Sequence, residues 1–550
     1  MAGRFVGALV LLLSVPFSDA LDGQANATLQ GRVSDSTGAG LPGATIRLRR
    51  EATGFDRSAQ TDAEGRYHIE GIPAQTYDVT AAARGFRSAA IAALTFEVAG
   101  IVVRDFRLEV GDTSETVVVR ASTSLIDQVT TSTGQVLTLQ AVQETPLNGR
   151  HFTDLALLSP GSLAPSQTGF STTPIRGIGA VAINTAGNRE EAAGFLINGV
   201  SANNLAFGSL GFQPPIASIQ EFKVDNSPFT VEHGHVSGAI VNLVTRPGTD
   251  QYRGEAYEFF RNDALDARNF FEFNTPDPHP FDRNQFGATF GGPILRGRMF
   301  FFGTYEGLRQ RQGLDMNGVV LSDVQRDAAT DPVVRNLLPL IPRANHFDAD
   351  GTPRFVGAAD ARVDENTWTA DVRHNAGTRN RLLVFFGRQR IEGTEPTAQG
   401  TNIPGFGNRR AITKSTLTVN ETYMFGAGLL NEARFGRTMQ DGGTFPAAEF
   451  NPAAYGIANG VNRPLGLPQM IVAGALTFGG PATLPQGRKD TLYVFNDALT
   501  YVAGRHTAKA GGEFRRFLND NFAEGTGQFN FPSMDAFLSG TGNAFSITLG

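Results

Sequence analysis

From residue 251 onward, the chain consists of short segments in which apolar and polar side chains alternate. On an extended strand, Trp368, Ala370 and Val372 would share one face. The opposite face would then carry Thr367, Thr369, Asp371 and Arg373. An apolar outer face and a polar inner face are typical of a strand in a membrane β-barrel, although sandwich strands alternate too. The pattern predicts about nine such strands between residues 251 and 517.

Aromatic residues gather in pairs and triplets along these strands, which favours a barrel over a sandwich. A membrane barrel carries a girdle of aromatic side chains at each interface. We interpret as girdle residues the clusters Phe259–Phe260, Phe270–Phe271, Phe300–Phe302 and Phe385–Phe386. Polar stretches rich in glycine and proline indicate long external loops at residues 310–364, 392–409 and 441–485.

No apolar run after residue 20 is long enough for a membrane-spanning helix. The longest candidate, Met470–Phe478, is short and contains a glycine, whereas a spanning helix needs ~20 apolar residues. If the chain spans a membrane, it must do so as a closed β-barrel, because lipid offers no partner to unpaired backbone groups. The 64 glycines and 42 phenylalanines favour an all-β chain with many turns.

The first twenty residues have the pattern of a secretory signal peptide. Arg4 supplies the positive start, Phe5–Val15 is the apolar stretch, and Ser18-Asp19-Ala20 places small residues at the cleavage site. We therefore expect residues 1–20 to be removed after Ala20, and the protein to be exported. The chain has no cysteine, which fits a bacterial envelope protein and excludes disulfides, thiol nucleophiles and cysteine zinc sites.

Residues 28–108 contain short strands between glycine-rich turns, which indicates a β-sandwich. Characteristic segments are Gly31-Arg32-Val33, Gly40–Ala44, Thr61–Tyr67 and Gly71-Ile72-Pro73. On these residues, the segment resembles the carboxypeptidase regulatory-like domain, a transthyretin-like β-sandwich whose fold is also called carbohydrate-binding-like. The resemblance implies an accessory module and says little about function.

Residues 122–250 have mixed strand and short-helix character, with three diagnostic blocks at Leu147–Gly161, Ser218–Val224 and Ser237–Thr245. These blocks resemble the plug domain of TonB-dependent outer-membrane receptors of the Oar-like family. That family usually has Asp-Gly in the plug turn, where this chain has Asn198-Gly199. Because asparagine tolerates the positive φ of such turns, we interpret the exchange as harmless.

The barrel region carries the same resemblance. Residues Arg283–Ile294 and Phe300–Gly307 are similar to the first barrel hairpins of the Oar-like family. The expected fold is therefore mainly β: a transthyretin-like β-sandwich, a mixed plug domain, and over residues 251–550 the first part of an antiparallel transmembrane β-barrel.

The segment at residues 112–121 lies between the sandwich and the plug. Within it, an extended run could add as a strand to the sheet edge of a partner protein, or could be the last strand of the sandwich. The Oar-like family places its TonB box, the segment bound by the energising protein, at this point. The resemblance therefore implies a TonB box formed by Glu115, Thr116, Val117, Val118 and Val119.

The resemblance implies a TonB-dependent receptor that binds a bulky substrate (peptide, protein or glycan) and moves it across the bacterial outer membrane. Its partners would be a TonB-type energising protein, outer-membrane lipid and an unidentified ligand. An alternative is a secreted or surface adhesin, or carbohydrate-binding β protein, based on the sandwich. An exported hydrolase is a third possibility.

The residues themselves offer little for catalysis or nucleic-acid binding. We find no Walker A, no G-x-S-x-G and no H-E-x-x-H, so we expect no enzyme activity, cofactor or metal site. The net charge of −6 gives no basic footprint for nucleic acid. Because receptors of this class close with ~22 strands, the roughly nine strands expected here also predict a fragment or a truncated gene product.

Overall fold

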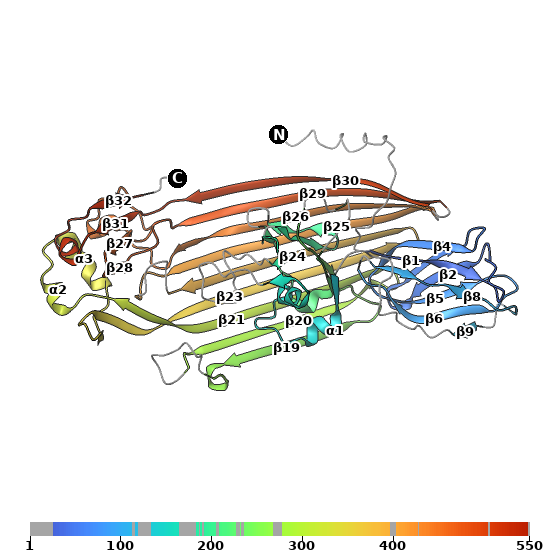
Figure 1. The fold of residues 1–550 in the computed structure, drawn as a ribbon, viewed down its shortest axis with the longest axis horizontal. Coiled ribbons are helices and arrows are strands. Elements are labelled where there is room, and N and C mark those ends of the chain that lie inside the picture. The colour runs from blue at the N-terminus through green and yellow to red at the C-terminus, as the bar shows by residue number, and fades with distance from the viewer. Residues whose placement is uncertain are drawn as a thin grey trace.

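The computed structural model describes residues 26–547, apart from 99, 113–115, 119–133, 164–182, 186, 190–191, 205–207, 227–231, 233–235, 268–277, 397–402, 427 and 504–505. The expected signal peptide and Phe270–Phe271 therefore lie outside the described residues. Figure 1 shows three regions along one long axis: a sandwich at one end, a large curved sheet with a plug in the middle, and a small cap at the far end.

The N-terminal region is a sandwich of two sheets. One sheet has the order β4-β1-β7, with β8 also pairing with β1, and the other has the order β3-β2-β5-β6-β9. Side chains that alternate inward along these strands form the core, which includes Leu29, Leu48, Tyr77 and Phe96. The strands are β1 (Asn26–Ser34), β2 (Thr45–Arg50), β3 (Phe55–Gln60), β4 (Arg66–Pro73), β5 (Thr76–Ala82), β6 (Ser88–Thr95), β7 (Ile101–Val103), β8 (Phe106–Arg107) and β9 (Thr116–Val118), and η1 (Glu51–Thr53) joins β2 to β3.

The plug is built on a five-stranded sheet of order β10-β17-β18-β13-β14. Its core contains Phe152, Phe195 and Phe222, and also Phe385 from the large sheet. The plug therefore shares its core with the wall around it. Its helical elements are α1 (Leu139–Glu144), η2 (Phe152–Leu158) and η4 (Ile216–Ser218), and its strands are β10 (Gly134–Thr138), β11 (Ser162–Leu163), β12 (Asn184–Thr185), β13 (Gly194–Ile197), β14 (Val200–Ser201), β15 (Asn203–Asn204), β16 (Ser209–Leu210), β17 (Ile219–Asp225) and β18 (Ile240–Thr245).

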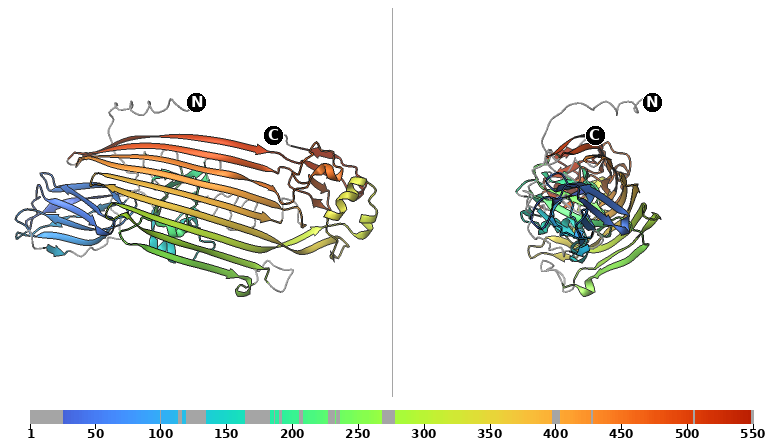
Figure 2. Two further views of the ribbon diagram at one scale, coloured as in Figure 1. Left: turned by 180° about the vertical axis from the view of Figure 1, so that it is seen from behind. Right: turned by 90° about the vertical axis from the view of Figure 1, so that its right-hand side faces the viewer.

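The large sheet consists of long antiparallel strands, each paired with its neighbour in the order β19-β20-β21-β23-β24-β25-β26-β29-β30. It curves around the plug, which lies on its concave side (Figure 2). Within the described residues, β19 and β30 form its two edges. The strands are β19 (Arg253–Asn262), β20 (Phe281–Leu295), β21 (Met299–Val319), β23 (Pro353–Ala376), β24 (Asn380–Glu395), β25 (Asn408–Gly426), β26 (Leu429–Pro446), β29 (Gln486–Ala503) and β30 (His506–Ala523), and η6 (Asp263–Leu265) follows β19.

The alternation read from the sequence corresponds to the two faces of this sheet. Thr369 and Asp371 are 6% and 2% exposed, because they face the plug, whereas Trp368 on the outer face is 56% exposed. Polar inward residues are thus covered by the plug, and the outer face is left to lipid. Among the described residues, no helix is long and apolar enough to cross a membrane.

Two details of the sequence interpretation are wrong. Phe300, Phe302 and Phe385 are buried on the inner face, so they are not girdle residues, whereas Phe386 is exposed on the outer face. Adjacent residues on a strand point to opposite faces, so a phenylalanine pair cannot lie entirely in a girdle. The expected loops are also shorter than predicted, because β21 continues to Val319 and β23 begins at Pro353.

The cap at the end opposite the sandwich is a small folded unit (Figure 1). Its core gathers Val334, Phe478 and Phe537 from three separate connections. Local caps define its helices: Asp331 accepts from the backbone N–H of Val333 and Val334 at 2.8 and 3.0 Å. Its elements are α2 (Asp323–Asp327), α3 (Pro332–Leu337), η7 (Leu338–Leu340), η8 (Pro452–Tyr455), β27 (Gln469–Val472), β28 (Thr477–Phe478), β31 (Gln528–Phe531), α4 (Met534–Leu538) and β32 (Ala544–Ser546). The short strand β22 (His346–Phe347) pairs with β23 of the large sheet.

Candidate functional site: the junction of plug, wall and sandwich

The plug turn Asn198-Gly199 joins β13 to β14 as a two-residue hairpin. Ile197 pairs with Val200, and Asn198 and Gly199 have φ values of 52° and 76°. Positive φ at both central positions is the type I′ arrangement, for which Asn-Gly is a favoured pair. The Asn198 side chain is buried, and its Nδ2 donates to Thr245 Oγ1 at 2.9 Å, while Thr245 N donates to Asn198 Oδ1 at 3.0 Å.

This turn is bonded to the wall of the sheet. The Thr245 hydroxyl donates to Asp371 Oδ2 at 2.5 Å, and Arg373 Nη2 donates to the Thr245 carbonyl at 2.6 Å. Asn420 Nδ2 donates to the Asn198 carbonyl at 2.6 Å. Arg373 also pairs with Asp371 at 2.9 Å. A carboxylate in place of the Asn198 amide would face Asp371 across a single hydroxyl, so we expect this residue to matter for the attachment of the turn.

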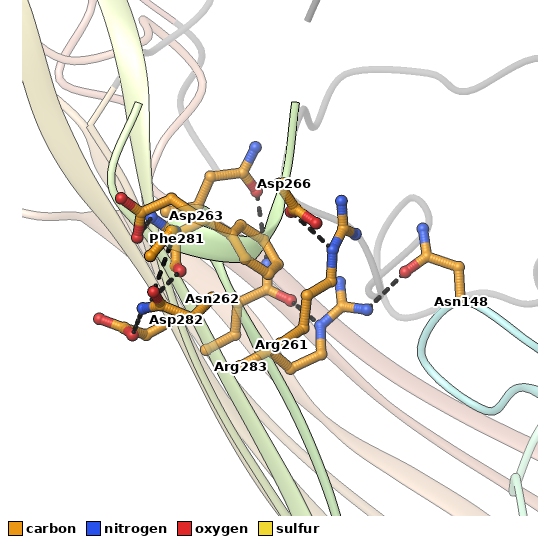
Figure 3. Close-up of polar contacts among 11 residues, drawn as sticks. Asn148, Arg261, Asn262, Asp263, Asp266, Phe281, Asp282 and Arg283 are labelled. Carbon is orange, nitrogen blue, oxygen red and sulfur yellow. Dashed lines mark hydrogen bonds and ion pairs between the residues drawn. The ribbon is translucent and has the colours of Figure 1, made fainter. Parts of the chain in front are cut away.

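A second plug contact involves the loop Asn148–His151, which belongs to the first diagnostic block. Arg283 Nη1 donates to Asn148 Oδ1 at 2.5 Å (Figure 3). The Arg150 guanidinium lies 4.0 Å from the centre of the Phe259 ring, and its backbone has a φ of 53°. Positive φ is strained for arginine, so tertiary contacts hold the loop in place. The sequence identified this block but gave no role to Arg150.

Figure 3 shows how the wall supports this contact. The guanidinium groups of Arg261 and Arg283 lie 4.8 and 5.2 Å from the Phe281 ring centre. Arg261 is also paired with Asp266 at 2.8 Å. Cation–π contacts hold both arginines, and an ion pair also holds Arg261. The Arg283 guanidinium can therefore donate to Asn148 of the plug while its position is fixed.

The sandwich docks on the same end of the sheet as the Asn198 turn. Asn26 Nδ2 donates to Glu432 Oε1 at 2.7 Å, and Asn375 Nδ2 donates to the Thr53 carbonyl at 2.9 Å. Arg381 of β24 donates to the Gly71 carbonyl. Its guanidinium also lies 4.9 Å from the centre of the Phe55 ring. These bonds join the sandwich to the wall at several separate strands.

The sandwich also contacts the plug directly. Glu221 of β17 accepts a hydrogen bond from the backbone N–H of Val98. Ala74 and Val98 pack on Val244 of β18 in a small apolar cluster. A cavity of about 110 Å³ lies between the sandwich, the plug and the large sheet. It is lined by residues such as Phe55, Tyr77, Asn198, Arg373, Arg381 and Glu432.

Two ionisable side chains, Glu221 and Arg57, are buried at this junction, and burial disfavours their charged forms. Burial, with a smaller contribution from the charge of Glu97, raises the pKa of Glu221 to about 7 against the opposing effects of the Val98 N–H and Lys223. Burial lowers the pKa of Arg57 to about 9, with a further contribution from the like charge of Arg381 across the interface. Such buried charges weaken an interface unless they are fully paired.

The predicted TonB box falls partly outside the described residues, which do not include Glu115 and Val119. The other three residues, Thr116–Val118, form β9 at the edge of the sandwich. They run parallel to β6, with Ser88, Ala89 and Ala90 opposite Thr116, Val117 and Val118. The segment is thus extended and paired on one side. Among the described residues, no group of three or more His, Asp or Glu side chains could hold a metal ion.

A curved sheet of long antiparallel strands around a folded plug is the architecture of a plugged β-barrel. Residues 244–331 and 321–549 match the family described as outer membrane beta barrel domain, and residues 28–109 match the carboxypeptidase regulatory-like domain. The barrel match covers more than half of the 550 residues, so the chain belongs to this outer-membrane β-barrel family. The protein is therefore located in the outer membrane.

A curated relative is the TonB-dependent transporter Oar of Myxococcus xanthus, which is 23% identical over 258 residues, covering 45% of this chain and 23% of the relative. Similar solved structures include the outer membrane transporter YddB from Escherichia coli, with 12% identity and a TM-score of 0.49 over 72% of this chain and 50% of that chain. The siderophore receptor PirA from Acinetobacter baumannii has 14% identity and a TM-score of 0.44 over the same 72% and 50%. The chain thus spans about a quarter of the length of this curated relative. These relatives are named as transporters or receptors.

Proposed function

We propose that the protein is a TonB-dependent outer-membrane transporter. The observation that carries this proposal is the plug, which lies within the curved sheet and is bonded to its wall through Thr245 and Asp371 at 2.5 Å. A barrel filled in this way does not conduct passively, so passage requires an input of force on the plug. The match to a TonB-dependent transporter over 45% of this chain supports this source of force.

We assign the TonB box to Glu115–Val119. A strand paired on one side has a free edge of backbone donors and acceptors, which a partner protein can recognise by strand addition. Because β9 is the last strand of the sandwich and precedes the plug in the chain, a pull on this segment acts on both regions. The energising partner would first draw β9 away from β6 and then release the sandwich from the barrel mouth.

The substrate proposed here is bulky: a peptide, a protein or a glycan. The strands on the cap side support this assignment, since β21 and β23 continue well beyond the apolar part of the outer face and bear a cap with its own core. This gives a broad external surface, whereas a small ion would need only a narrow, closed site.

The test uses the absence of cysteine from these 550 residues, so a thiol introduced here is the only one among them. Ala74 is 3% exposed at the contact between sandwich and plug. In the full-length protein in cells, Ala74→Cys should react with maleimide faster when the TonB-type partner is present and the proton gradient is intact. Ser36→Cys, on an exposed turn of the sandwich, should react equally in both conditions.

Equal reaction of Ala74→Cys with and without the partner, while the protein remains in the outer membrane, would contradict partner-driven opening. That outcome would favour a surface adhesin or carbohydrate-binding role. Fast labelling under all conditions would instead show that the sandwich does not close the barrel mouth.

A further inference from the structure

The contact between the sandwich and the barrel wall includes a glycine, Gly71, near the end of β4. Its carbonyl accepts a hydrogen bond from the Arg381 guanidinium of β24, which also lies 4.9 Å from the centre of the Phe55 ring. Gly71 has a φ of 68°, and a Cβ at this position would lie 3.3 Å from Cδ2 of Leu430 on β26. The glycine therefore lets the backbone of the sandwich approach the wall closely.

A second guanidinium, that of Arg57 on β3, lies at the same contact. It donates to the carbonyl of Glu70, one residue before Gly71, and lies 5.7 Å from the centre of the same Phe55 ring. The Arg57 side chain belongs to the sandwich, and the residue is 7% exposed. Two like charges, one from the sandwich and one from the wall, are thus held at consecutive carbonyl groups and on one aromatic ring.

The nearest carboxylates are bonded to other groups. Glu70 pairs with His68 at 2.8 Å, and Glu432 of β26 pairs with Arg434 at 3.3 Å. In the part of the chain that the structure describes, neither of the two guanidinium groups is paired with a carboxylate. Like charges repel more strongly in a buried contact than in water, because the local dielectric is lower.

The two arginines differ in what their contacts hold together. Arg381 reaches from the wall to Gly71 and Phe55 of the sandwich, so these contacts are made only in the docked state. The contacts of Arg57 with Glu70 and Phe55 are within the sandwich, so they persist when the sandwich leaves the wall. In the docked state, burial and the like charge of Arg381 lower the pKa of Arg57 to about 9, so the group stays charged at neutral pH.

We propose that the charge of Arg57 weakens the docking of the sandwich on the barrel, by repulsion from Arg381, and so makes the docked state easier to release. The contacts of Arg381 determine where the sandwich docks, and the repulsion from Arg57 limits how tightly it does so. A buried charge without a paired counter-charge opposes the formation of the interface that buries it. This inference rests on the proposed function, in which the docked sandwich closes the barrel mouth until the partner draws it away.

The test measures docking in purified full-length protein, without the partner, by maleimide labelling of Ala74→Cys. Each rate is divided by that of Ser36→Cys carrying the same arginine variant. Arg57→Gln should lower this labelling ratio at least three-fold, because the repulsion is lost and the sandwich stays docked. Arg57→Lys keeps the charge and should stay within about two-fold of the unmodified protein.

The matched control is Arg32→Gln, which should leave the labelling ratio unchanged. Arg32 is an exposed arginine of the sandwich and, like Arg57, donates to a backbone carbonyl within it, that of Glu64 at 2.9 Å. Arg57→Met removes the charge but keeps an unbranched apolar side chain, and it should lower the ratio as Arg57→Gln does. A lower ratio in only one of these two uncharged variants would overturn the proposal.

The Arg381→Gln background shows whether the effect depends on the like charge. Arg381→Gln alone should raise the labelling ratio, because the hydrogen bond to the Gly71 carbonyl is lost. In that background, Arg57→Gln and Arg57→Lys should give equal ratios. A difference that persists without Arg381 would overturn the proposal. So would an Arg57→Gln ratio that equals or exceeds the Arg57→Lys ratio while Arg381 is present.

This comparison and the test of the proposed function can fail separately. Equal labelling of Ala74→Cys in cells with and without the partner would contradict partner-driven opening, and the comparison in purified protein would still stand. Partner-driven opening in cells, together with equal ratios for Arg57→Gln and Arg57→Lys in purified protein, would remove only the role proposed for Arg57.

Discussion

Thr245 of the plug donates its hydroxyl hydrogen to Asp371 of the barrel wall at 2.5 Å. The same hydroxyl oxygen accepts a hydrogen bond from Asn198 Nδ2 at 2.9 Å. Because Asn198 is the donor in that bond, the hydroxyl hydrogen of Thr245 remains available to Asp371. The plug turn and the wall are thus matched through one shared side chain. The Asn-Gly sequence of this turn is part of the attachment as well as a choice of turn geometry.

This relationship predicts the effect of restoring the more usual aspartate. Asn198→Asp should destabilise the plug in the barrel by about 1–3 kcal/mol, because it removes a buried donor and faces Asp371 with a like charge. Thermal unfolding and limited proteolysis of the full-length protein should detect it. Asn317→Asp, at an exposed position 3.2 Å from Arg354, is the control and should be neutral. Equal stability of both variants would contradict the role of the shared hydroxyl.

The TonB box assignment predicts that backbone geometry matters more than side-chain identity. Val118→Pro should abolish binding of the purified periplasmic domain of the TonB-type partner, because proline removes a backbone donor and fixes φ. Val118→Thr keeps strand geometry and should bind within about two-fold of the unmodified protein. Normal partner binding by the proline variant would place the box elsewhere.

Docking of the sandwich on the plug should depend on pH through Glu221. Its docked pKa of about 7 lies above the ordinary value of 4.5, so the docked state binds more protons between these values. Docking is then strongest below pH 4.5 and weakens as the pH rises through about 7. The thiolate is the reactive form of cysteine, so each rate is divided by that of Ser36→Cys at the same pH. This ratio of maleimide labelling rates for Ala74→Cys in purified protein should be higher at pH 8 than at pH 5.

Glu221→Gln is the matched variant for this titration. The amide oxygen can still accept from the Val98 N–H, but the side chain no longer ionises. The pH dependence of the labelling ratio between Ala74→Cys and Ser36→Cys should disappear, and this ratio should stay low at pH 8. An unchanged pH profile in this variant would assign the effect to another group.

The membrane face can be checked along a single strand. On the outer face, Val419 is a register partner of Val384 and Phe435 on the neighbouring strands. Val419→Arg places a charge among these apolar side chains and should cost about 2–4 kcal/mol of barrel stability. Thr413→Arg lies on the same face of β25 but nearer the cap, opposite Arg390, and should cost about 0–1 kcal/mol. The folded, heat-modifiable band on a gel reports assembly. Equal yields would show that the membrane lies at a different height.

Local periodicity determined much of the barrel from the sequence alone. Successive side chains on a strand point to opposite faces, so the alternation around Trp368 and Thr369 places one outward and the other inward with no knowledge of neighbours. The turn at Asn198-Gly199 is local in the same sense, because two positive φ values follow from those two residue types.

The ends of the strands could not be read in this way. Polarity in a barrel strand marks where lipid gives way to water, whereas hydrogen bonding to the neighbouring strand decides where the strand stops. Gln310 and Asp364 are the ends of a loop predicted from the sequence, yet both lie within paired strands. Outside the membrane, a strand can be polar on both faces and remain in the sheet.

Only the tertiary structure decided which apolar side chains face the membrane and which pack in the core of the plug. Phe385 and Phe386 are chemically identical neighbours, yet one completes the plug core and the other faces outward. The contact of Val98 with Glu221 joins segments 123 residues apart, and no local pattern encodes it. The sequence determined the faces of each strand, because those depend on backbone geometry. Whether a given face contacts lipid, the plug or the sandwich was decided by packing between segments that are distant in the sequence.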